Sequence, residues 1–302
     1  MKNHLIGVLV LAILISACRP QNPPRQFTKS KFPFDSTVVK LMNLPAEIDE
    51  SSGIIKIGNS LWTHNDSGDD PKLYEIDLAS KQLVRIVNVE RAKHRDWEDI
   101  SQDSLFVYVG DFGNNIGDRQ DLTIYRVPKS GLAEGQEAVS AEKITFRYPE
   151  QKRFDTGAYK HNFDCEGMIR LDSSLFLFTK NHDNGRCSVY ELPIEPGEYE
   201  AQLIDSMDTE GVITGADIDT ESGVICLSGY TLMDGFEPFI WVLSDYSGHT
   251  FFQGKHQRLE LTFLAQTEGI CTIGGNQFYL SCEAEDNGDP RVFLFDANRW
   301  LK

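Results

Sequence analysis

The segment Asp96-Trp97-Glu98-Asp99-Ile100 recurs in altered form along the chain, and this recurrence determines the fold. The related segments share a polar beginning, a small or acidic central residue and an apolar end. They follow one another at intervals of roughly 50 residues, which is the length of one blade in propeller-forming repeats. The five segments are Glu50-Ser-Ser-Gly-Ile54, Asp96-Trp-Glu-Asp-Ile100, Asp164-Cys-Glu-Gly-Met168, Thr214-Gly-Ala-Asp-Ile218 and Gln266-Thr-Glu-Gly-Ile270.

Each segment is followed by further short apolar runs that are typical of strands, separated by loops rich in Asp, Asn and Gly. Second strands are predicted at 60–63, 105–110, 175–179, 224–228 and 277–281, and third strands at 72–78, 122–127, 187–192, 238–243 and 291–295. A fourth strand is expected in most units, as at 143–148. The sequence therefore predicts an all-β, five-bladed β-propeller with four-stranded antiparallel blades, and a six-bladed ring is the alternative.

The last unit ends at Lys302 with only three predicted strands. Residues 36–43, which precede the first unit, can supply the missing outer strand and so close the ring. Closure of this kind removes the exposed strand edge that an open array of sheets would leave. The longest interval, between Glu98 and Glu166, indicates an insertion around residues 153–163.

The repeat also predicts which loops share a face. In an up-and-down blade, the loop before strand one and the loop between strands two and three lie at the same end, and loops on a rigid scaffold are common binding sites. The alternative is that their Asn, Asp and Gly residues simply form turns. The candidates for ligand binding at this mouth are Asn65, Asp66, Asp96, Asp111, Asp164, Lys180 and Glu283.

One residue of strand one in each unit is expected to point toward the central axis. Carboxylates brought this close cannot all stay ionised unless a cation or shared protons compensate them. Calcium fits because it accepts many oxygen ligands in loose geometry, whereas zinc would require a His and Cys cluster. In the alternative, these carboxylates only accept hydrogen bonds from the next blade. The predicted metal column is Ser52, Glu98, Glu166, Ala216 and Glu268.

The order of this column, one residue per blade, resembles the five-bladed calcium-activated nucleotidases (apyrases). Asn65-Asp66-Ser67-Gly68, Tyr108-Val109-Gly110 and Glu283-Ala284-Glu285-Asp286-Asn287-Gly288 resemble segments of the same family. The resemblance implies a central calcium and hydrolysis of phosphoanhydrides. Ala216 departs from the family, which has a hydroxyl residue there. The chain also resembles uncharacterised envelope propellers that carry Asp-Trp-Glu-Asp-Ile and Gly-Asp-Phe-Gly-Asn-Asn.

The N-terminus predicts secretion and lipidation. Lys2 precedes an apolar run at 5–15, which has the length of a signal-peptide core and is too short to span a bilayer. The run leads into Leu14-Ile15-Ser16-Ala17-Cys18, which resembles the lipobox of bacterial lipoproteins. We expect a signal peptide at 1–17, a lipidated Cys18 with a Pro-rich tether at 18–35, and the propeller domain at 36–302. The predicted location is the cell envelope, on the periplasmic or outer face of a bacterial membrane.

The net charge of −17 disfavours binding to nucleic acid or to anionic lipid headgroups. A protein, a glycan or a small phosphorylated ligand remains as partner. No nucleophile elbow, phosphate-binding Gly-rich loop or zinc-protease helix motif is present. We therefore expect an envelope propeller that binds calcium and presents its loops to a ligand. The alternative is a calcium-dependent hydrolase of phosphoanhydrides or phosphoesters, and a six-bladed lactonase is a third, so whether the chain is an enzyme stays open.

The cysteines after Cys18 are predicted to be buried free thiols, with a single disulfide from Cys226 to Cys282 or Cys271 as the alternative.

Overall fold

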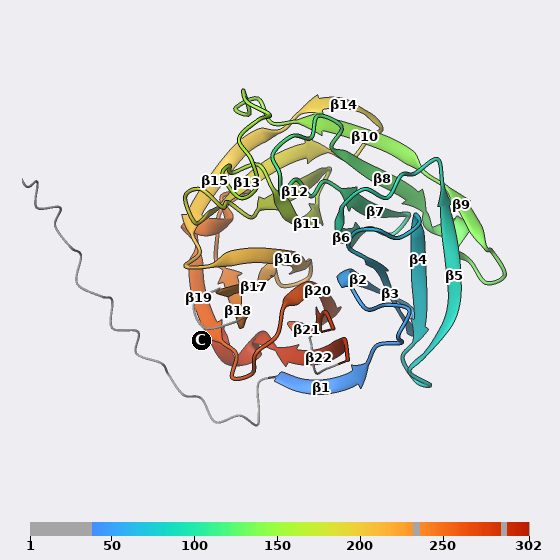
Figure 1. The fold of residues 1–302 in the computed structure, drawn as a ribbon. Helices are drawn as coiled ribbons and strands as arrows, with labels where there is room; N and C mark the ends of the chain where they lie inside the picture. The colour runs from blue at the N-terminus through green and yellow to red at the C-terminus, as the bar shows by residue number, and fades with distance from the viewer. Residues whose placement is uncertain (1–37, 232–235, 285–288, 302) are drawn as a thin grey trace, which may run out of the picture. The chain divides into compact units, whose positions relative to one another are not determined.

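The computed structural model describes residues 38–231, 236–284 and 289–301. The predicted signal peptide, Cys18 and the Pro-rich tether lie outside the described residues. Five sheets, antiparallel except for one parallel outer strand in each of two, surround a common centre and form a propeller ring, as Figure 1 shows. The prediction of an all-β propeller with five blades is confirmed.

The first strands of the blades line the centre of the ring, and the later strands follow outward in order (Figure 1). Blade one contains β2 (Ser51–Ile57), β3 (Ser60–Asn65), β4 (Lys72–Asp77) and β5 (Gln82–Glu90), and blade two contains β6 (Trp97–Gln102), β7 (Phe106–Asp111), β8 (Thr123–Pro128) and β10 (Glu142–Arg147). Blade three contains β11 (Cys165–Leu171), β12 (Ser174–Thr179), β13 (Arg186–Pro193) and β15 (Gln202–Asp208). Blade four contains β16 (Val212–Asp219), β17 (Val224–Thr231), β18 (Glu237–Ser244) and β19 (Lys255–Glu260).

Blade five joins both ends of the described chain. Its inner strands are β20 (Thr267–Gly274), β21 (Gln277–Cys282) and β22 (Arg291–Asp296), and its outer strand is β1 (Val38–Asn43). The antiparallel register places Val38 opposite Phe295 and Asn43 opposite Arg291. The prediction that an N-terminal strand closes the last blade is confirmed.

Two short strands that the sequence did not predict link neighbouring blades at their outer edges. After β8 the chain forms a 3-10 helix, η1 (Lys129–Leu132), and then β9 (Ala138–Ser140), which pairs in parallel with β5 of blade one. Similarly, β14 (Gly197–Glu200) leaves blade three and pairs in parallel with β10 of blade two. Each link covers an outer edge that would otherwise expose unpaired backbone groups.

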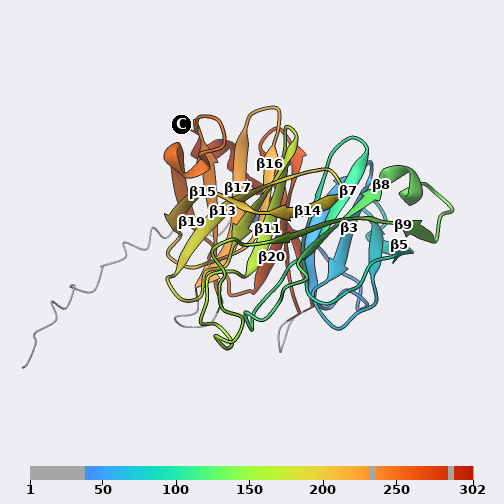
Figure 2. The same ribbon diagram turned by 90° about the horizontal axis from the view of Figure 1, so that it is seen from above.

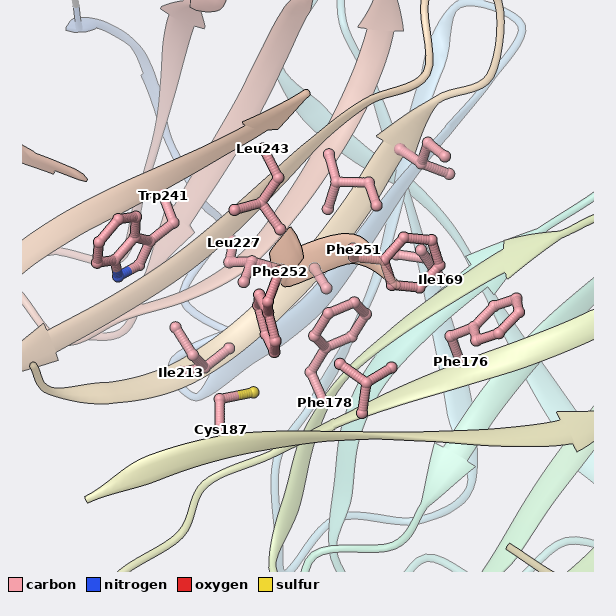
Figure 3. Close-up of a cluster of buried hydrophobic side chains, with 14 of the residues drawn as sticks. Ile169, Phe176, Phe178, Cys187, Ile213, Leu227, Trp241, Leu243, Phe251 and Phe252 are labelled. Carbon is pink, nitrogen blue, oxygen red and sulfur yellow. The ribbon is translucent and has the colours of Figure 1, made fainter. Parts of the chain in front are cut away.

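Apolar side chains fill the spaces between the blades. Between blades three and four, the 3-10 helix η2 (Phe251–Gln253) inserts two fully or nearly fully buried phenylalanines among Phe176, Phe178 and Trp241 (Figure 3). Aromatic residues supply large buried areas of this kind at low entropic cost. A third 3-10 helix, η3 (Ala297–Trp300), follows β22.

The cysteines of the propeller are buried thiols outside any disulfide, as predicted. Cys165, Cys187, Cys226, Cys271 and Cys282 form no disulfide, so the alternative bridge from Cys226 is wrong. Each lies in a strand where its thiol packs as a small apolar group. Among the residues that the structure describes, no helix has the length and apolar character needed to cross a membrane.

Candidate metal centre at one mouth of the propeller

Backbone hydrogen bonds tie the predicted mouth loops together. In blade three the N–H of Lys180, at the end of strand two, donates to the carbonyl of Asp164, which precedes strand one, at 2.8 Å. The same link joins Asp66 to Glu50 at 2.9 Å in blade one. Strands seen edge-on in Figure 2 run between the two faces of the ring, so these loops gather at one end of the strands. The predicted grouping of loops at one mouth is confirmed for these pairs.

A β-bulge at the start of strand one sets the direction in which the side chain of the central residue of each repeat points. The register of β6 with β7 breaks between Trp97 and Asp99, and that of β11 with β12 breaks between Cys165 and Gly167. The residues at the bulges are therefore Glu98 and Glu166. A bulge leaves one residue unpaired and re-aims its side chain, which is why bulges are common beside functional sites.

In blade four the equivalent bulge lies between Ile213 and Gly215, so Thr214 takes the place assigned to Ala216. The predicted column was shifted by two residues in this blade. Gly215 gives the reason, because a Cβ there would lie 2.4 Å from the carbonyl oxygen of Glu268 in the next blade. Neighbouring first strands approach so closely that only glycine fits, as also at Gly269. The recurrent glycine after the bulge was the sequence signal that identifies Thr214.

Two of the three predicted glutamates meet in an acidic cluster. Single carboxylate oxygens from Glu98, Asp164 and Glu166 lie within 4.8 Å of one another, and so do oxygens from Asp66, Asp96 and Glu98. Glu98 belongs to both groups. Asp66, Asp96 and Asp164 were predicted as ligand-face residues, and the structure adds them to the possible metal ligands. We call these five carboxylates the mouth cluster.

Burial and mutual repulsion raise the pKa values of this cluster. Desolvation, followed by the charges of Asp96 and Glu283, raises the pKa of Asp66 to about 8. Desolvation and the charge of Asp164 raise the pKa of Asp96 to about 6. The pKa of Glu98 is raised well above its usual value by burial and by the charge of Asp66. The cluster therefore requires protons or cations to balance its charge at neutral pH.

One ammonium group and one imidazole lie beside the cluster. Lys180 Nζ is 3.0 Å from Glu166 Oε1, and its side chain is 12% exposed. His182 Nε2 is 2.9 Å from Asp164 Oδ2, while the other oxygen of Asp164 accepts the backbone N–H of Asn114 at 2.6 Å. These contacts fix the orientation of the carboxylates. The sequence places His182 in a loop at the predicted mouth, but a single loop histidine carries no motif that would mark it as part of a site.

Two carboxylate oxygens of the cluster have no hydrogen-bond partner among the described residues and could therefore bind a cation. Glu98 is only 3% exposed, and its Oε1 is buried without a hydrogen-bond partner among the described residues. Asp66 Oδ1 is in the same condition. Gly113 covers this space, because a Cβ there would lie 1.9 Å from Glu98 Oε1 and 2.5 Å from Asp96 Oδ2. Buried oxygens without a partner, on carboxylates that converge, fit a hard cation.

Three members of the predicted metal column do not enter the cluster. The hydroxyl of Ser52 donates to the carbonyl of Glu98, and the N–H of Ala216 donates to Asp99 at 3.3 Å. Glu268 is buried and its pKa is raised by desolvation and by the charge of Glu283, but it belongs to neither group of converging oxygens. The Ser52 side chain of blade one is therefore hydrogen-bonded to the backbone of blade two.

The remaining ligand-face candidates have separate partners. Asp111 forms a buried ion pair with Arg119 at 3.0 Å. Asn65 donates to the carbonyl of Glu47 at 3.0 Å. Desolvation and the charge of Glu50 raise the pKa of Glu283 to about 7. Asp111 and Asn65 thus support the loops, and Glu283 lies near the cluster without joining it.

No protein-family model matches the chain, and no curated protein shows significant sequence similarity. The resemblance to nucleotidases therefore rests on its motifs alone. Solved structures with a similar fold include a glucose dehydrogenase (TM-score 0.55, 8% identity, covering 87% of this chain and 99% of that chain). A second glucose dehydrogenase has a TM-score of 0.53 at 9% identity, covering 87% of this chain and 100% of that chain. The PQQ-bound aldose sugar dehydrogenase from Streptomyces coelicolor has a TM-score of 0.50 at 12% identity, covering 87% of this chain and 99% of that chain. At these identities the chain is similar to these proteins in its β-propeller fold alone.

Proposed function

We propose that this propeller binds a divalent cation at the mouth cluster and presents the surrounding loops to a ligand. Calcium is the cation that we propose. One observation carries the proposal. Glu98 is buried among other carboxylates, with an oxygen that has no hydrogen-bond partner in the described part of the chain. Burying an ionised carboxylate without compensation is very costly, and a coordinated cation removes that cost.

The ligand set favours calcium over softer metals. The mouth cluster offers only carboxylate oxygens, whereas zinc sites use His or Cys ligands in most cases. Calcium takes six to eight oxygens at about 2.3–2.6 Å in flexible geometry, so carboxylates, backbone carbonyls and water can complete its shell. Glu98, Asp66, Asp96, Asp164 and Glu166 would hold the ion. Glu268 remains a neighbouring charge that strengthens the local negative potential.

Thermal unfolding of the purified chain with calcium, and with a chelator, tests this proposal. At a calcium concentration 100 times its Kd, binding stabilises the folded state by about 2.7 kcal/mol, so the Tm should rise measurably. Glu98→Gln keeps the side-chain shape but removes the charge, and should abolish the rise. Glu198→Gln, on the exposed surface of β14, is the matched control and should keep it. A wild-type Tm unchanged by calcium, magnesium and manganese would contradict cation binding.

We also propose that the chain is a lipoprotein of the cell envelope, anchored to a membrane through Cys18. The motif at 14–18 and the Pro-rich segment after it support this location. Labelling cells with radioactive palmitate should mark the wild type and leave Cys18→Ser unlabelled. The ligand of the mouth is then a protein, a glycan or a small phosphorylated molecule of the envelope.

One observation favours a second function, calcium-dependent hydrolysis of phosphoanhydrides or phosphoesters. His182 is hydrogen-bonded to Asp164 at the edge of the mouth cluster, where an imidazole could accept a proton from an attacking water. A bound cation would supply polarisation of a phosphoryl oxygen. Release of phosphate from nucleoside di- and triphosphates, with calcium and then with chelator, distinguishes the two functions. Phosphate release that persists in Glu98→Gln would exclude chemistry at this cluster.

A further inference from the structure

The mouth cluster contains two groups of converging oxygens rather than one. The first group joins Glu98 to Asp66, which follows β3 of blade one, and to Asp96, which directly precedes β6; the second joins Glu98 to Asp164 and Glu166 of blade three. Within each group the ligand oxygens lie within 4.8 Å of one another. Building on the proposed cation binding, we propose that the mouth holds two divalent cations, with the Glu98 carboxylate bridging them.

The bridging role follows from the position of Glu98. It is the member common to both groups, and its side chain is almost completely buried. Its Oε1 has no hydrogen-bond partner among the described residues, so this oxygen is free to bind a cation. Asp66 Oδ1, in the first group, is likewise buried and unpartnered. Each carboxylate has two oxygens, so one residue can bind two ions at once.

The charges support two ions. When all are ionised, the five carboxylates of the mouth cluster carry five negative charges. The Lys180 ammonium contacts Glu166 Oε1 and supplies one positive charge. Two divalent cations supply the other four. A single divalent cation would leave two of these charges uncompensated.

The second group is held in place for coordination. Asp164 is fixed by His182 and by the backbone N–H of Asn114, and Glu166 is fixed by Lys180. Partners of this kind orient metal-binding carboxylates and are as much a part of a metal site as the ligands. In the first group, the backbone of Gly113 packs so closely on Glu98 and Asp96 that only glycine fits there. Paired cations about 3.5–4 Å apart can hold one anionic ligand between them.

Manganese is the probe for this inference, because two Mn²⁺ ions bridged by a carboxylate give a magnetically coupled EPR spectrum. We expect equilibrium dialysis to find two Mn²⁺ per chain and EPR to show the coupled pair. Asp66→Asn should remove the first ion and Glu166→Gln the second, each leaving one uncoupled ion. Glu98→Gln should weaken both by tenfold or more, and Glu198→Gln should change neither.

The wild-type result decides the matter even if a variant fails to fold. One Mn²⁺ per chain would overturn the paired site and leave the proposed cation binding standing. No bound Mn²⁺, Ca²⁺ or Mg²⁺ would overturn both. Two ions without magnetic coupling would show separate sites and contradict the bridging role of Glu98. Circular dichroism melts of each variant identify any loss of binding that comes from unfolding.

Discussion

The carboxylate of Asp99 in β6 accepts a hydrogen bond from the backbone N–H of Met168 in β11 at 2.6 Å. The same oxygen accepts the N–H of Ala216 in β16 at 3.3 Å. Asp99 is completely buried, and it therefore joins blades two, three and four at the centre of the ring. The residue lies next to Glu98, so the strand that supplies this carboxylate of the mouth cluster is also the strand that connects the blades.

Replacing Asp99 by Leu should strongly destabilise the propeller. The variant leaves the N–H groups of Met168 and Ala216 buried without acceptors, and each unsatisfied group costs about 1–3 kcal/mol. Asp99→Asn retains a carbonyl oxygen as acceptor and should lose less. Urea denaturation measures both losses, and an Asp99→Leu variant as stable as the wild type would show that these bonds contribute nothing.

Replacing Arg119 by Met should destabilise the loop that covers the mouth cluster. Arg119 is buried, pairs with Asp111 at 3.0 Å and donates to the carbonyl of Gly113 at 2.9 Å. Removing one partner of a buried ion pair costs about 3–5 kcal/mol, because the other charge is left uncompensated. The double variant with Asp111→Asn should recover part of this loss in urea denaturation. Equal losses in the single and double variants would contradict this explanation.

If β1 closes the ring, truncating a buried and an exposed side chain of this strand should have very different effects on the free energy of unfolding. Met42 is 4% exposed and packs with Leu44 and Ile54, whereas Lys40 in the same strand is exposed. Met42→Ala should lower the free energy of unfolding by about 2–5 kcal/mol, as is usual when a buried side chain is truncated. Lys40→Ala should change it by less than about 0.5 kcal/mol. Similar effects of the two substitutions would argue against β1 as the closing strand.

Asp103 predicts how stability changes in acid. Burial opposes its ionisation, but hydrogen bonds from the N–H groups of Leu105 and Phe106 and from the Tyr108 hydroxyl lower the pKa of Asp103. Because the folded-state pKa lies below the unfolded value of about 3.9, the stabilisation is complete above that pH and is lost as the pH falls through the folded value. Asp103→Asn should therefore be less stable than the wild type at pH 7.

The gap between Asp103→Asn and the wild type should narrow below about pH 4. Urea denaturation at pH 7, 5 and 3.5 measures it, with the exposed Asp155→Asn as the control. A gap that stays constant across this range would mean that the Asp103 charge does not contribute.

Much of the fold follows from local patterns. Alternation of apolar runs and turn residues predicted the inner three strands of every blade, and the missing outer strand of the last repeat predicted that β1 completes blade five. Strands β9 and β14 were not predicted, because each is short and has a partner in another blade. Ala216 was predicted in the column because Asp217-Ile218 matches the Asp99-Ile100 that follows Glu98, whereas the recurrent glycine after the bulge marks Thr214.

The sequence predicted only part of the candidate site, because only some of its residues occupy equivalent positions in the repeat. Glu98 and Glu166 occupy equivalent places in the repeat, so the sequence alone identified them. Asp66, Asp96 and His182 join them only because loops from three blades meet at one mouth, and their distances depend on contacts between distant segments.

By itself, the sequence determined the repeat, the number of blades and the acidic character of the first strands, because strand periodicity and repeat spacing are local properties of the chain. Tertiary structure alone decided which carboxylates converge and which of their oxygens remain unpaired. It also decided that the Ser52 hydroxyl donates to the Glu98 carbonyl and that the Ala216 N–H donates to the Asp99 carboxylate. The physical reason is the bulge in strand one. In each blade the bulge leaves one residue of strand one unpaired and turns the side chain of that residue away from the regular pleat. The direction in which this side chain points depends on how closely the next blade approaches.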